Sequence, residues 1–78
     1  MDIKIKITIR FTPREQVRAW ELIEDLRDLG AIVEPNVTAA IYGSVAPEEL
    51  HFNFSADETL EKAIVLIKRW QKQRSVNG

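Results

Sequence analysis

The chain has 78 residues, which suits one domain with one compact core. Hydrophobic residues make up 45% and charged residues 29%, which is typical of a globular protein and not of a disordered one. The absence of Cys excludes disulfides, a thiol nucleophile and a zinc–thiolate site. The formal net charge of −1 gives no global argument for binding to nucleic acid or to a membrane surface.

The sequence contains no segment suited to a membrane. No apolar run approaches the roughly 20 residues that a spanning helix needs, and the first residues lack the apolar region of a signal peptide. We therefore expect a cytoplasmic protein without a membrane partner. Residues 1–78 are expected to form a single domain, with 75–78 as a frayed tail.

The strongest pattern in the chain runs from Ile3 to Phe11. Its odd positions are all large and apolar, while its even positions are Lys4, Lys6, Thr8 and Arg10. This two-residue period predicts a β-strand with one buried face and one polar face.

A helix is predicted directly after this strand. Thr12 is a suitable N-cap, Pro13 fits the first helical position, and Glu15 completes a capping box. The helix is expected to run to about Leu29 and to end at Gly30. One stripe of the helix is apolar and is predicted to face the core: Ala19, Leu22, Ile23, Leu26 and Leu29.

Two more strands and a second helix complete the chain. Residues 31–42 are interpreted as a second strand with a bend at Pro35, in which Val37, Ala39 and Ile41 point inward and Thr38, Ala40 and Tyr42 point outward. Leu50, Phe52 and Phe54 alternate with His51 and Asn53 and predict a third strand. A capping box from Ser55 to Glu58 predicts the start of the second helix.

The element order β-α-β-β-α predicts an α+β, ferredoxin-like split β-α-β fold. Its three-stranded antiparallel sheet would carry two helices on one face, with the strands in the spatial order second, third, first. The alternative places the first two strands side by side and parallel. The predicted core contains Ile3, Ile5, Ile7, Ile9, Phe11, Leu22, Leu26, Ile41, Phe52, Phe54, Leu60, Ile64 and Ile67.

No catalytic or metal-binding motif stands out in the sequence. There is one His, no Gly-rich phosphate loop and no cluster with the spacing of metal ligands. We therefore expect a protein that is not an enzyme and that uses no cofactor or metal.

The open face of the sheet is the first candidate binding surface. Basic side chains beside one Tyr and one His are the groups that hold phosphates and stack bases in RNA-binding sheets, although such sheets use more aromatic residues. The simpler interpretation is a polar surface whose lysines protect an edge strand from aggregation. The candidate residues on this face are Lys4, Lys6, Thr8, Arg10, Tyr42 and His51.

Val17 and Trp20 form a second candidate site on the first helix. They lie among acidic residues and are candidates for a protein contact. The leading functional hypothesis is a small protein-binding or regulatory module that acts through its first-strand edge and its helix surfaces. The alternative is a single-stranded nucleic-acid binder that uses the open basic face.

Self-association through the first strand is also expected. That strand has no Pro or Gly, yet the predicted topology leaves it at an edge with unpaired backbone groups. We therefore favour a homodimer over a monomer. The regular patterning fits a de novo design, whereas Pro35 and the off-stripe Val17 fit a natural protein, such as one from a phage or another mobile element.

Overall fold

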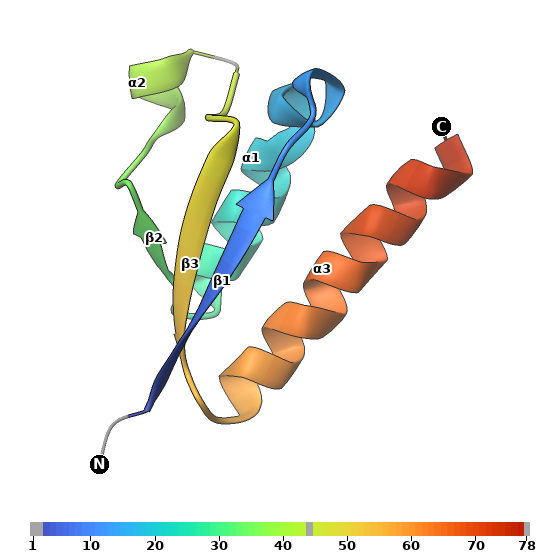
Figure 1. The fold of residues 1–78 in the computed structure, drawn as a ribbon. Helices are drawn as coiled ribbons and strands as arrows, with labels where there is room; N and C mark the ends of the chain where they lie inside the picture. The colour runs from blue at the N-terminus through green and yellow to red at the C-terminus, as the bar shows by residue number, and fades with distance from the viewer. Residues whose placement is uncertain (1–2, 44, 78) are drawn as a thin grey trace.

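The computed structural model describes residues 3–43 and 45–77, without the side chains of residues 39, 42 and 73–77. Within this part of the chain, no helix is both long and apolar enough to cross a lipid bilayer. The elements follow one another as β1 (Lys4–Arg10), α1 (Pro13–Asp28), β2 (Ile32–Glu34), α2 (Ala39–Tyr42), β3 (Glu49–Ser55) and α3 (Glu58–Asn77) (Figure 1).

The three strands form one antiparallel sheet in the order β1-β3-β2. Helix α1 lies behind the sheet and α3 packs beside it (Figure 1). The predicted ferredoxin-like arrangement and the predicted strand order are therefore confirmed. Because β3 separates β1 from β2, the alternative with the first two strands adjacent is wrong. Strand β1 lies at one edge of the sheet, as expected.

Helix α1 begins and ends where the sequence predicts. The Thr12 hydroxyl accepts a hydrogen bond from the Glu15 backbone N–H at 3.4 Å, and the Glu15 carboxylate accepts one from the Thr12 N–H at 2.7 Å. At the other end Gly30 has a φ of +102°, which glycine adopts without the steric cost that other residues incur. The helix turns Ala19, Leu22, Ile23 and Leu26 into the core.

The prediction of a strand through residues 37–42 is wrong. β2 ends at Glu34, directly before Pro35, a residue that sheets tolerate only in edge strands, at strand ends and at bulges. Val37 is fully buried, and its carbonyl accepts a hydrogen bond from the Arg27 guanidinium on α1. The chain therefore turns away from the sheet and forms α2, where Ile41 is 65% exposed instead of buried.

Helix α3 starts later than the predicted capping box. Ser55 is the last residue of β3, and the following N–H of Ala56 donates to the Ile3 carbonyl at 2.9 Å. Because the ladder with β1 holds this segment, Ser55 does not cap the helix. The Asp57 carboxylate does so by accepting a hydrogen bond from the Thr59 N–H at 2.8 Å. Residues 75–77 of the expected tail lie in α3, and residue 78 lies outside the described residues.

The core lies between the sheet and the helices. Of the predicted core, Phe11, Leu22, Leu26, Phe52 and Phe54 are buried, while Ile7, Ile9, Leu60 and Ile67 are partly buried and pack against them. Four predicted core residues are exposed instead: Ile3, Ile5, Ile41 and Ile64. The core also takes in small residues that the sequence-based list omitted, namely Ala31, Ala46 and Ala63.

Candidate functional site

Strand β1 has one long edge whose backbone groups form no hydrogen bond with any of the described residues. At its two ends, the Ile3 carbonyl accepts from Ala56 and the Phe11 N–H donates to the Glu48 carbonyl at 2.6 Å. Antiparallel strands alternate between residues that bond to the neighbour and residues that point away from it. The odd residues of β1 therefore bond to β3, and the N–H and C=O groups of Lys4, Lys6, Thr8 and Arg10 point outward. We call this row the β1 edge.

The helix side of the β1 edge is apolar and incompletely covered. Exposure falls along the strand from 58% at Ile3 to 38% at Ile5, and Phe11 is only 3% exposed. The Phe11 ring contacts Trp70 at a centroid distance of 5.9 Å, so the far end of β1 is covered by α3. At the near end, where β1 starts, no described residue covers Ile3 and Ile5 in this way.

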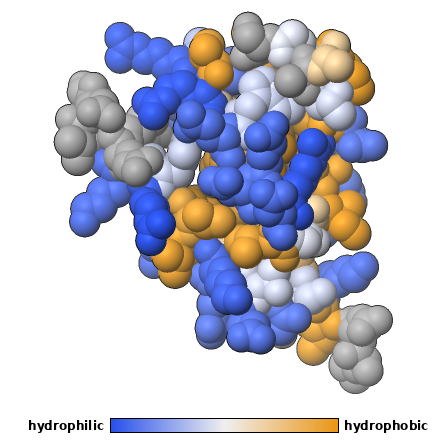
Figure 2. Space-filling view, turned by 180° about the vertical axis from the view of Figure 1, so that it is seen from behind, coloured by the Kyte–Doolittle hydropathy of each residue, from blue (hydrophilic) through white to orange (hydrophobic). Residues whose placement is uncertain are grey.

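Ile64 lies toward the same end of the molecule as Ile3 and Ile5. Helix α3 starts directly after β3, beside Ile3, and reaches Phe11 at Trp70, so it runs in the same direction as β1. Ile64 lies near the start of this helix and is 38% exposed. We call Ile3, Ile5 and Ile64 the apolar end. Figure 2 shows the molecule from the side on which the helices lie. Apolar surface is exposed there between hydrophilic regions.

The open face of the sheet is ordered in rows across the strands. Lys6 lies opposite Asn53, and Thr8 lies opposite His51. On the other side of β3, Ile32 lies opposite Asn53 and Glu34 lies opposite His51. Lys4, Lys6, Thr8, Arg10 and His51 therefore share this face, as the alternation predicts.

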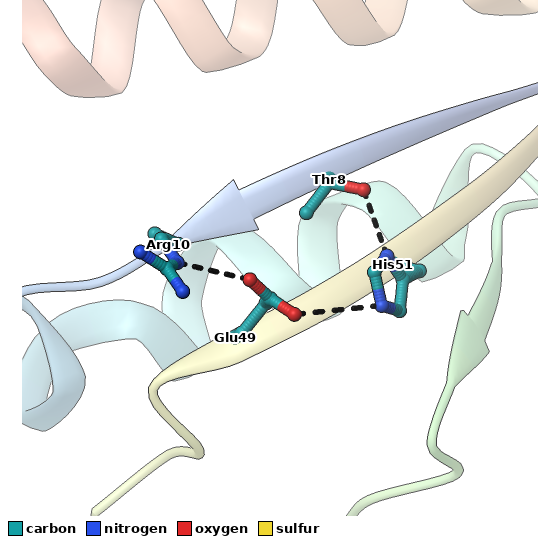
Figure 3. Close-up of polar contacts among 4 residues, drawn as sticks. All are labelled: Thr8, Arg10, Glu49 and His51. Carbon is teal, nitrogen blue, oxygen red and sulfur yellow. Dashed lines mark hydrogen bonds and ion pairs between the residues drawn. The ribbon is translucent and has the colours of Figure 1, made fainter.

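Four side chains at one end of this face contact one another and form a polar cluster (Figure 3). The Arg10 Nε donates to Glu49 Oε1 at 2.9 Å, and Glu49 Oε2 lies 3.7 Å from His51 Nε2. His51 Nδ1 and Thr8 Oγ1 form a hydrogen bond of 2.8 Å. The Arg10 guanidinium and the His51 imidazole at this end thus already have partners within the protein.

Lys4 and Lys6 differ from Arg10 in this respect. Both are exposed, and among the described residues neither side chain forms a hydrogen bond or an ion pair. Arg10 is neutralised by Glu49 across the strand pair. Among the described residues, the positive charge of the open face that has no ionic partner therefore lies at the start of β1, near the apolar end.

The structure separates the other predicted site residues from this face. Tyr42 was expected on the open face, but its backbone belongs to α2 and its side chain lies outside the described residues, so this placement on the sheet is wrong. Val17 and Trp20 lie on α1. Val17 is 58% exposed, whereas Trp20 packs against the core.

Two carboxylates of the open face were missed in the sequence. Glu49 lies one residue before the predicted third strand and continues the alternation of His51 and Asn53 toward the N-terminus. Glu34 reaches the same face from β2 and accepts a hydrogen bond from Asn53 Nδ2 at 2.9 Å. The face therefore carries both signs of charge and is not uniformly basic.

Comparisons with protein-family models, with curated proteins and with solved structures find no match to this chain. The described residues contain no group of three His, Asp or Glu side chains that could hold a metal ion.

Proposed function

We propose that the chain is a small, non-enzymatic protein-binding module that acts through the β1 edge and the adjoining helix surface. The observation that carries this proposal is a strand whose outward N–H and C=O groups have no partner in the described part of the chain and lie beside exposed isoleucines. Proteins that recognise extended segments use such an edge for hydrogen bonds and the neighbouring apolar surface for side chains. In a four-stranded ferredoxin-like sheet, a further strand would cover this edge.

A nucleic-acid-binding function has less support. Sheets that bind single strands stack bases on aromatic side chains and track phosphates with cations. Tyr42 is not on the sheet, the His51 ring already contacts Thr8, and Glu34 and Glu49 place negative charge on the same face. A fluorescence titration with a labelled oligonucleotide at two salt concentrations tests this alternative. Salt-sensitive binding that is lost on Lys6→Glu would favour it.

A second copy of the chain is one occupant to consider for the β1 edge. Two copies would meet antiparallel, with their even residues opposed across a two-fold axis. In the registers that pair most of the strand, the opposed residues are Lys6 with Lys6, Lys4 with Arg10, or Lys6 with Arg10. The pair of lysines costs on the order of 0.2–1 kcal/mol, and a pair that includes Arg10 costs less because Glu49 already offsets that charge. Charge therefore favours a different protein over the homodimer.

Site-specific photo-crosslinking tests the proposed function directly. A benzophenone side chain replaces Thr8 on the β1 edge, and in a matched protein it replaces the exposed Glu21 on α1. We expect protein adducts from position 8 that disappear when Lys6→Pro is added, because Pro removes an outward N–H without removing a bond to β3. Adducts that form equally from both positions, or that survive Lys6→Pro, would overturn the proposal.

A further inference from the structure

The β1 edge makes two separate demands on any strand that pairs with it. Successive side chains of an added strand point alternately to the two faces of the sheet. Next to residues 4–6, one set of side chains would lie on the open face beside Lys4 and Lys6. The other set would lie in the helix layer beside the apolar end, which Ile3, Ile5 and Ile64 form.

The positive charge of the open face favours acidic residues among the side chains of the added strand that lie on that face. Lys4 and Lys6 stand in the two consecutive outward positions of the edge, and neither has an ionic partner among the described residues. An acidic side chain opposite each lysine would supply the partner that Glu49 supplies to Arg10 at 2.9 Å. No acidic residue is needed opposite Arg10, because Glu49 already pairs with its guanidinium.

The exposed isoleucines favour apolar residues among the side chains of the added strand that lie in the helix layer. Ile3 and Ile5 are 58% and 38% exposed, although they lie on the same side of the sheet as the fully buried Phe52. Apolar side chains from a neighbouring strand would remove this surface from water, as the chain itself does at Phe11 and Trp70. Acidic or other charged side chains in these positions would be desolvated without a partner.

Strand β3 already shows the same pattern on the other side of β1. Its open-face residues Glu49, His51 and Asn53 alternate with the buried Leu50, Phe52 and Phe54. Glu49 stands opposite Arg10, and the apolar residues stand opposite Ile5, Ile7 and Ile9. Strand β3 thus shows the alternation of polar and apolar residues that suits β1, and at Glu49 it shows an acid paired with a β1 cation, while Asn53 stands opposite Lys6.

We infer that the β1 edge binds an extended segment of another protein in which acidic residues alternate with apolar ones, paired beside Lys4 and Lys6. This inference rests on the proposed protein-binding function and specifies its partner. A second copy of β1 does not meet the demand, because it offers Lys, Thr and Arg where acids are required. A segment of about five to six residues suffices, which is the usual length of a strand.

Fluorescence anisotropy with labelled synthetic peptides tests the inference. The probe is a hexapeptide of alternating Glu and Val, compared with a hexapeptide of the same composition in two blocks and with one of alternating Lys and Val. We expect the alternating acidic peptide to bind at least about tenfold more tightly than either control. Added salt should weaken this binding, because exposed charges are screened.

Paired charge reversals identify the surface that binds. K4E/K6E should weaken the binding of the acidic peptide about tenfold or more and strengthen the binding of the Lys–Val peptide. K68E/K72E makes the same change in net charge on the exposed side of α3 and should leave both affinities unchanged. Circular dichroism of the variants checks that the fold is retained.

Three results would overturn the inference. They are equal binding of the alternating and block peptides, an equal effect of the two charge reversals, and a mass near twice 9.0 kDa in sedimentation that Lys6→Pro returns to the monomer. The last result would assign the β1 edge to a second copy. If these peptides fail while the position-8 adducts still depend on Lys6, the partner class is wrong and the proposed function stands. If the adducts fail as well, both are wrong.

Discussion

Phe52→Ala should unfold the protein, whereas Ile5→Ala should leave it folded. Phe52 is fully buried at the centre of the sheet, opposite Ile7 on β1 and Val33 on β2. Truncating a buried Phe to Ala costs about 3–5 kcal/mol. A domain of this size has a total stability of about 3–5 kcal/mol, so the variant should be largely unfolded in buffer.

Ile5 is the contrasting position on the neighbouring strand. Burying a whole Ile side chain is worth about 1.5–3 kcal/mol. Because Ile5 is 38% exposed and a Cβ remains in the variant, the loss should be roughly 1 kcal/mol. Urea denaturation followed by far-UV circular dichroism measures both values. Equal losses at the two positions would refute this reasoning, since they would mean that Ile5 is buried in solution and that something covers the β1 edge.

Three further stability predictions follow from single contacts. Arg10→Ala should change the free energy of unfolding by less than about 1 kcal/mol, because its ion pair with Glu49 joins side chains that are 77% and 42% exposed; a larger loss in urea titration would show that the open-face cluster is structurally essential. Thr12→Ala removes the side-chain cap of α1 and should cost about 1 kcal/mol in the same titration, while an unchanged midpoint would argue against the capping box. Gly30→Ala should cost on the order of 1–3 kcal/mol through its φ of +102° alone, since an added Cβ meets no atom within 4 Å, and a variant as stable as the parent in thermal melting would contradict this backbone conformation.

The parts of the fold that the sequence predicts are those encoded by neighbouring residues. The alternation of β1, the Thr12–Glu15 capping box and the strand order all depend on short patterns or on simple rules of connection. Residues 37–42 alternate equally well, yet their path depends on the burial of Val37 and its contact with Arg27. No local pattern contains those contacts, so the sequence alone predicts a strand there.

For the candidate site as well, the sequence predicts the features that depend on local alternation and not those that depend on contacts between elements. Alternation correctly places Lys4 and Lys6 on one face, because that requires only a strand. The pairing of Arg10 with Glu49 depends on the register between β1 and β3, which the sequence does not specify. Alternation also predicts on which side Ile3 and Ile5 lie, but not that this side lacks a cover.

Amide hydrogen exchange measured residue by residue tests the central claim most directly. In the free protein, the outward N–H groups of Lys4, Lys6 and Thr8 should exchange rapidly, while those of Ile5 and Ile7 should be protected by their bonds to β3. Saturation with the alternating Glu–Val peptide should slow the exchange of the Lys4 and Lys6 amides, because the added strand accepts hydrogen bonds from them. Equal protection of odd and even residues in the dilute free protein, or unchanged exchange at Lys4 and Lys6 in the presence of the peptide, would contradict the account.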